Sequence, residues 1–109
     1  MKPKIEWLNK GENGQNPEIR FTSPIGVDDG YRNNPQGEKK STMTFYKHSE
    51  DEAGIEWIVN DGEFVEGIGL WFNEAKELVD YDGVFELPMQ AIMMIRGLGY
   101  HVSKEYEPE

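Results

Sequence analysis

The sequence predicts an α+β fold, in which an antiparallel β-meander carries one C-terminal helix packed on the sheet and ends in a short strand. Short stretches that alternate apolar and polar residues follow one another, with Gly, Asn and Asp between them, as in strands joined by turns. Only residues 88 to 98 place apolar residues at helical spacing. The 109 residues suffice for one hydrophobic core, so we expect a single domain over 1–109.

The N-terminal part predicts two short strands and a long loop. Residues 4 to 9 and 18 to 23 have strand-like apolar patterns and are separated by the turn-forming stretch GENGQNP. Residues 25 to 40 contain three Gly, a Pro and two consecutive Asn, with few large apolar groups. This composition predicts a flexible loop at 25–40, which is also a candidate binding loop.

The centre of the chain predicts a hairpin followed by a further strand. Residues 41 to 48 and 54 to 60 alternate, with β-branched and aromatic members, as paired strands do. Asp61 and Gly62 then form a tight-turn signal, because these residues suit backbone positions with positive φ. We expect the next strand over residues 64 to 72.

Two glycines interrupt the side-chain pattern of that strand. Gly67 and Gly69 predict a bulge, a bend or a close approach of another part of the backbone. Beyond them, residues 76 to 81 and 84 to 87 predict two more short strands, or one strand with a bend.

The predicted helix has two apolar sides. Pro88 suits its first turn, where the missing N–H would have no intrahelical partner. One side should pack on the sheet, and the opposite side needs a second cover from the N-terminal strands, a second protomer or a partner protein. The sheet-facing side comprises Leu87, Ala91, Met94, Ile95 and Leu98, and the opposite side comprises Met89, Ile92 and Met93. Residues 100 to 106 predict the final short strand.

The charge of the chain is concentrated in one segment. The chain carries 21 acidic and 11 basic residues, for a net charge of −10, and residues 50 to 86 hold twelve carboxylates against one cation, Lys76. Such a field attracts partners of opposite charge and speeds their approach. It disfavours binding to nucleic-acid phosphates and to anionic membranes, because both depend on Lys and Arg.

Composition also disfavours a secreted or membrane protein. The chain has no Cys, which excludes disulfides, thiolate nucleophiles and Cys-based zinc sites. No apolar run approaches the roughly 20 residues that cross a bilayer, and the first residues lack the apolar core of a signal peptide. We therefore expect a cytoplasmic protein without a membrane partner.

The motifs assemble no catalytic, cofactor or metal site. The pattern D-x-D-G-x-x-E at 80–86 resembles part of a calcium loop, but in that register the closing glutamate should fall at Met89. The two histidines, His48 and His101, belong to no recognisable catalytic triad. We therefore expect no enzymatic activity, no cofactor and no metal.

The acidic segment nevertheless predicts a binding surface. In a meander, alternation places acidic side chains on the solvent face of the sheet and in its turns. Like charges this close cost stability, although an acidic face can also serve solubility alone. The predicted partner-binding face comprises Glu56, Asp61, Glu63, Glu66, Glu77, Asp80 and Asp82.

Three functions remain open on these grounds. The first is a small acidic protein-binding module, an inhibitor or regulator that docks on a basic, nucleic-acid-binding surface by imitating phosphate charge. In composition the chain is similar to phage or viral antagonists and to toxin-neutralising immunity proteins. The second is a homo-oligomeric assembly subunit that uses Met89, Ile92 and Met93.

The third function is a single-strand nucleic-acid binder that uses N-terminal cations and the 25–40 loop. Aromatic residues on strands can stack with bases. The same residues are also typical of the core of a sheet, which is where we expect them. The aromatic residues concerned are Trp57, Trp71, Phe72 and Tyr81.

Overall fold

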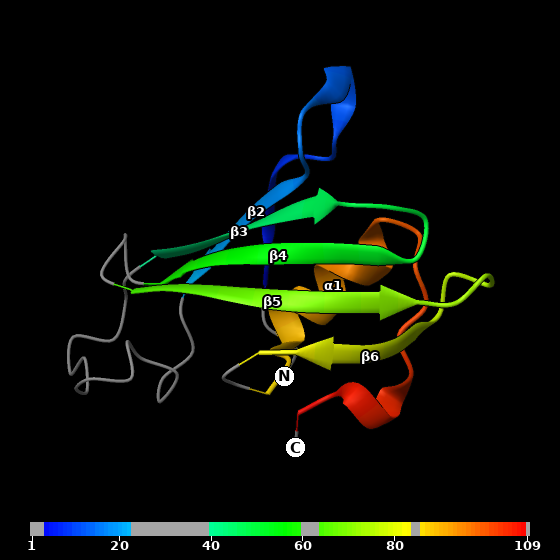
Figure 1. Cartoon of the computed structure of the whole chain (residues 1–109). Helices are drawn as coiled ribbons and strands as arrows, with labels where there is room; N and C mark the ends of the chain where they lie inside the picture. Colours follow the sequence, from blue (N-terminus) through cyan, green and yellow to red (C-terminus); the bar gives the residue numbers. More distant parts are fainter. Residues whose placement is uncertain (1–3, 23–39, 60–63, 84–85, 109) are drawn as a thin grey trace.

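The structure is a computed structural model, and it describes residues 4–22, 40–59, 64–83 and 86–108 (Figure 1). Six strands, one α-helix and two 3-10 segments make up the described part. The bounds are Glu6–Asn9 (β1), Glu12–Gly14 (η1), Glu18–Thr22 (β2), Lys40–Lys47 (β3), Glu52–Val59 (β4), Phe64–Phe72 (β5), Leu78–Asp82 (β6), Met89–Gly97 (α1) and Lys104–Tyr106 (η3). Of the helices described, none has the length and apolarity needed to span a membrane.

The six strands form one antiparallel sheet in chain order, β1 to β6. The β4–β5 ladder is continuous, from the Glu52–Trp71 pair to the Val59–Phe64 pair. α1 lies against one face of the sheet (Figure 1). The predicted α+β fold, an antiparallel meander with one packed helix, is therefore confirmed.

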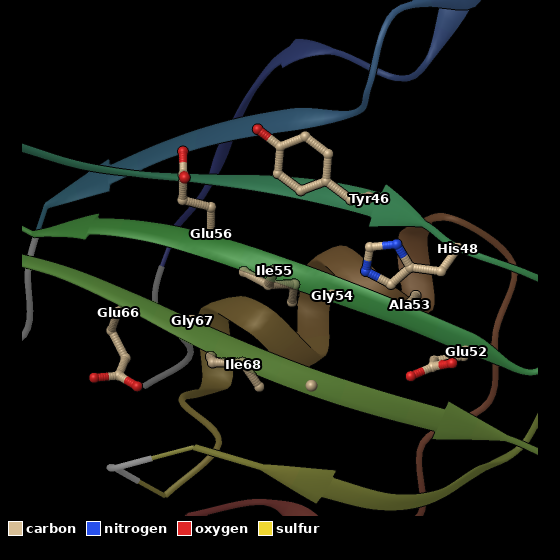
Figure 2. Close-up of a pocket in the computed structure, with 11 residues that line it drawn as sticks. Tyr46, His48, Glu52, Ala53, Gly54, Ile55, Glu56, Glu66, Gly67 and Ile68 are labelled. Carbon is tan, nitrogen blue, oxygen red and sulfur yellow. The ribbon is translucent and has the colours of Figure 1, made fainter.

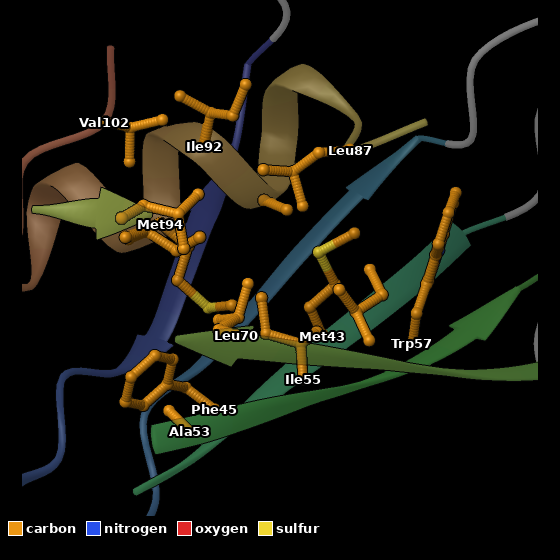
Figure 3. Close-up of a cluster of buried hydrophobic side chains, with 14 of the residues drawn as sticks. Met43, Phe45, Ala53, Ile55, Trp57, Leu70, Leu87, Ile92, Met94 and Val102 are labelled. Atoms are coloured by element: carbon orange, nitrogen blue, oxygen red, sulfur yellow. The ribbon is translucent and has the colours of Figure 1, made fainter. Parts of the chain in front are cut away.

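Alternation along the strands gives the sheet an inner face, which α1 covers, and an outer face. Directly paired residues of an antiparallel ladder point to the same side, so buried residues line up across neighbouring strands. Trp57, Leu70 and Met43 are each 0% exposed. Figure 3 shows part of this core between sheet and helix. Its inner-face members are Ile19, Phe21, Met43, Phe45, Ala53, Ile55, Trp57, Ile68, Leu70, Phe72 and Leu78.

A β-bulge in β6 decides which way its side chains face. Trp71 pairs with Asp80, whereas the next residue, Phe72, pairs with Leu78, so Val79 is an extra residue. An extra residue in one strand reverses the facing of the positions beyond it. Leu78 therefore stays in the core, 5% exposed, while Asp80 shares the outer face with Trp71.

α1 is buried on more than its sheet-facing side. Pro88 is the N-cap, with an extended backbone (φ −72°, ψ 154°), so the helix begins one residue later than predicted. Ile92, assigned from sequence to the side that needs a second cover, is 0% exposed and belongs to the core. Met89 and Met93 are half-buried. Within this chain, Ile92 is thus a core residue rather than an interface residue.

The N-terminal strand supplies part of the second cover. A Cβ built on Gly97 of α1 would fall 2.6 Å from Cζ2 of the Trp7 indole. Trp7 pairs with Ile19 of β2 and packs against the margin of the core. Only a glycine at this position allows β1 and α1 to approach so closely.

The segment after α1 differs from the prediction, because residues 100 to 106 do not form a strand. His101 makes a single parallel bridge just before β6. The chain then turns into Lys104–Tyr106, where the Ser103 hydroxyl accepts a hydrogen bond from the Glu105 N–H at 3.3 Å. A local side-chain cap thus competes successfully with continued strand pairing.

Three other predictions involve residues outside the described part, and one of them is the tight turn at Asp61 and Gly62. The loop predicted at 25–40 lies outside the described part except for Lys40, which begins β3. Of the strand predicted at 84–87, the first two residues also lie outside, and Glu86 and Leu87 have no regular secondary structure.

Gly97→Ala should destabilise the protein, although alanine favours a helix over glycine by about 1 kcal/mol. Its Cβ would overlap the Trp7 ring. In a Trp7→Leu background the overlap disappears, and the same substitution should be neutral or stabilising. Urea unfolding of the four proteins gives the coupling between the two sites. Equal effects in both backgrounds would contradict the contact.

Ile92→Ala should lower the free energy of unfolding by about 2–5 kcal/mol, because it removes a fully buried side chain. Met93→Ala is the matched control and should cost less, since Met93 is half-buried. Urea unfolding measures both. An unchanged stability of Ile92→Ala, together with a changed oligomeric state in sedimentation, would make Ile92 an interface residue after all.

Candidate functional site

The candidate site lies on the outer face of the sheet, opposite α1 (Figure 1). The register places Tyr46, Gly54, Gly69 and Asp82 in one row across β3, β4, β5 and β6. Gly54 and Gly69, the two central residues of this row, have no side chains. Strands lie about 4.8 Å apart, so Tyr46 and Asp82 border a gap about 14 Å wide between their backbones.

Aromatic rings lean over the two central glycines. A Cβ on Gly54 would lie 3.2 Å from Nε2 of His48, and a Cβ on Gly69 would lie 3.0 Å from Cη2 of Trp71. Gly67 differs, because a Cβ there would meet nothing within 4 Å. The predicted bulge and the predicted close approach of backbone are therefore wrong for Gly67 and Gly69: the β4–β5 register has no bulge at this point, and it is the Trp71 ring that approaches Gly69.

The missing side chains leave a shallow, open trough of about 410 Å³. Tyr46 and His48 provide its aromatic walls, and Glu52 and Glu56 border it with carboxylates. Figure 2 shows these four side chains around Gly54, with the helix behind the sheet. The backbone of β4 and β5 forms the floor. We call this feature the glycine trough.

Exposed carboxylates on the outer face include Glu6 on β1, which is paired with Arg20, and four nearer the trough. We call these four the outer-face carboxylates: Glu52 and Glu56 on β4, and Asp80 and Asp82 on β6. Asp80 also accepts a hydrogen bond from the backbone N–H of Tyr81 at 2.9 Å through Oδ1. The two strands carry these charges on either side of β5, whose residues at 67 and 69 are glycines. The face is thus acidic at its margins and low in the middle.

Two ion pairs of the described part of the chain involve other carboxylates. They are Lys47–Glu50 at 3.3 Å and Arg96–Glu107 at 2.9 Å, and neither uses an outer-face carboxylate. Arg20 is on the outer face but belongs to β2, opposite Thr42 of β3, and so lies two strands away from β4. These three cations therefore lie apart from the acidic margins of the trough.

The structure brings together three residues of the predicted acidic face: Glu56, Asp80 and Asp82. It places Glu66 differently, because Glu66 is paired with the buried Trp57 and is only 9% exposed. That pairing puts its side chain on the inner side of β5, at the margin of the trough (Figure 2). Glu66 therefore does not share the solvent face with Glu56.

The remaining predicted acidic residues lie apart from this face. Glu77 is in the turn before β6, where its Oε1 accepts a hydrogen bond from Nδ2 of Asn73 at 2.9 Å. Asp61 and Glu63 lie outside the described residues.

The four aromatic residues considered as base-stacking platforms divide between the two faces. Trp57 and Phe72 are in the core, as their strand positions predicted. Tyr81 is half-buried and meets the Tyr106 ring edge-on, with centroids 6.0 Å apart. Trp71 alone of the four is on the outer face, because it pairs with the exposed Glu52, so the expectation that it lies in the core is wrong.

The charge of Asp80 also reaches the C-terminal turn. Burial raises the pKa of the Tyr106 hydroxyl above its ordinary value of 10.0, and the neighbouring Glu105, Asp80 and Tyr81 raise it further. Tyr106 is therefore neutral at physiological pH, and it adds no charge beside the acidic face.

Sequence reasoning missed Tyr46, His48 and Glu52 as members of the site. Alternation could have placed Glu52, Gly54 and Glu56 on one face of their strand, since they are spaced by two. What the sequence did not contain was the register that puts them beside Tyr46 and Gly69.

No group of three His, Asp or Glu side chains among the described residues could hold a metal ion. A second hollow of about 360 Å³ is lined by Arg96 and residues 99 to 102. The Arg96 guanidinium donates hydrogen bonds to the Val102 carbonyl at 2.7 Å and to the Glu107 carboxylate at 2.9 Å, and these bonds hold the C-terminal segment.

Comparisons with protein-family models, with curated proteins and with solved structures found no match to this chain.

Gly67→Thr should leave stability unchanged or raise it by up to about 1 kcal/mol, because threonine favours a strand and its Cβ meets open space. Gly54→Thr is the matched control on β4. It should be less stable than Gly67→Thr, because its Cβ would crowd the His48 ring. Urea unfolding compares the two. A marked loss of stability in Gly67→Thr would contradict an open floor at this position.

Proposed function

We propose that this protein is a non-enzymatic binding module whose outer sheet face docks on a basic surface of a partner protein. The observation that carries this proposal is the gathering of the outer-face carboxylates on one exposed face, around the glycine trough. The partner's basic surface can be one that otherwise holds nucleic acid, in which case the protein acts as an inhibitor or regulator.

Electrostatics support this partner class. Like charges gathered on one face of the sheet repel one another, and a docked cationic surface would remove that cost. The whole chain has a net charge of −10, so its long-range field also attracts a basic partner. A phosphate backbone or an anionic membrane would be repelled by the same face.

Shape supports docking by this face as well. Gly67 keeps the floor open beside Glu56, so a side chain of a partner can reach the backbone of β5 there, next to the rings that cover Gly54 and Gly69. An acidic surface that served solubility alone would not require a trough bordered by aromatic rings. The assembly-subunit alternative loses one of its three proposed residues, because Ile92 is 0% exposed.

The proposal is tested by neutralising the face without changing the fold. The outer-face variant carries Glu52→Gln, Glu56→Gln, Asp80→Asn and Asp82→Asn. The control variant carries Glu12→Gln, Glu50→Gln, Glu74→Gln and Glu86→Gln, which are exposed residues off this face. Both variants lose four negative charges. The control also removes the exposed Lys47–Glu50 ion pair, which contributes little to stability.

Proteins captured by the wild type from nuclease-treated lysate are identified, purified and titrated by calorimetry. We expect a basic partner whose affinity falls at least about tenfold with the outer-face variant and much less with the control. The affinity of the wild type should also fall as salt rises. Equal losses in both variants, or a partner that is not basic, would contradict the proposal.

A further inference from the structure

We propose that the glycine trough is a binding site for an arginine side chain, which a basic partner inserts between the aromatic walls and the outer-face carboxylates. This inference rests on the proposed function and states which side chain of the partner the face recognises. Three observations support it: Gly67 has no structural role visible in the described residues, aromatic rings line the trough, and carboxylates border it.

The first observation is that Gly67 has no structural role visible in the described residues. Its φ is not in the left-handed region, and nothing lies within 4 Å of the position of a Cβ. Glycine weakens the interior of a strand, and a β-branched residue would suit this position better. What Gly67 does provide is an open floor beside Glu56, its direct partner on β4.

The second observation is the aromatic boundary. The rings of Tyr46 and His48 line the trough, and the Trp71 indole reaches its edge at Gly69. Aromatic faces attract cations. A guanidinium is planar and more weakly hydrated than an ammonium, so it stacks on such rings and enters a shallow apolar slot more readily than lysine does.

The third observation is the position of the carboxylates. Glu52 and Glu56 border the same trough from β4, and Asp82 stands at the end of the row that contains Gly54 and Gly69. An arginine side chain offers five N–H donors in a fixed fork, which can pair with a carboxylate through two parallel hydrogen bonds. The trough thus offers both kinds of contact that distinguish arginine from lysine.

The test uses two acetylated peptides of equal length and charge, one alternating glycine with arginine and the other alternating glycine with lysine. Each is titrated into the protein by calorimetry at about 0.05 M salt, where charge attraction is strong. The measured quantity is the ratio of the two dissociation constants. Backbone NMR signals of residues 46, 48 and 67 locate the bound peptide.

Three variants alter the trough without removing charge. Gly67→Thr fills the floor, with Gly67→Ala as a smaller step at the same position. Tyr46→Leu removes one aromatic wall, and it keeps the test valid if a substitution at position 67 disturbs the sheet. The outer-face variant and its control report the electrostatic contribution separately.

We expect the wild type to prefer the arginine peptide by at least about threefold. Gly67→Thr and Tyr46→Leu should bring this ratio close to one while leaving the affinity for the lysine peptide nearly unchanged. Gly67→Ala should fall between the wild type and Gly67→Thr.

The failure of this inference and the failure of the proposed function give different results. If the two peptides bind with equal affinity and the outer-face variant binds neither, the arginine-binding site is overturned and the acidic docking face is kept. Equal losses in the outer-face variant and its control would overturn both. The protein is also titrated with a single-stranded oligothymidylate. Tighter binding of this oligonucleotide than of either peptide would overturn the inference and the proposed function together.

Discussion

The uninterrupted register of β3, β4 and β5 is the constraint on which the rest of the structure depends. It aligns Tyr46 with Gly54 and Gly69, and it places Trp57 and Leu70 on the opposite, buried face. A slip of one residue would exchange the faces of a strand and expose its core side chains to water. The hydrophobic core therefore holds the trough in place, although none of the core side chains belongs to the trough's aromatic or acidic border.

Stability and recognition are assigned to different faces of one sheet. The inner face and α1 provide the buried area, and Trp7 of β1 closes over the C-terminal end of the helix at Gly97. The outer face carries repelling carboxylates and glycines that weaken a strand, both of which cost stability. Such costs are tolerable because the core is built independently of the outer face, and they are the features on which binding is proposed to depend.

Much of the fold could be predicted because its signals are local. Alternation located β2 to β5, helical spacing located α1, and strand position correctly assigned Trp57 and Phe72 to the core. The predictions that differ depended on features that alternation does not reveal, namely a local hydrogen-bonded cap at Ser103 and the pairing of residues distant in sequence. Residues 100 to 106, predicted as the final strand, form a single bridge and a 3-10 turn. Glu66 faces inward because its paired residue on β4 is the buried Trp57.

The sequence by itself determined a small acidic chain with a meander, one helix and a concentration of carboxylates in its second half. Composition and periodicity are properties of neighbouring residues, so they can be read along the chain. Only the tertiary structure decided that Glu52, Glu56, Asp80 and Asp82 share a face and that glycines at 54, 67 and 69 form a trough beside Tyr46 and His48. The physical reason is that strand register, together with the bulge at Val79, sets which side chains meet, and both depend on how the whole core packs.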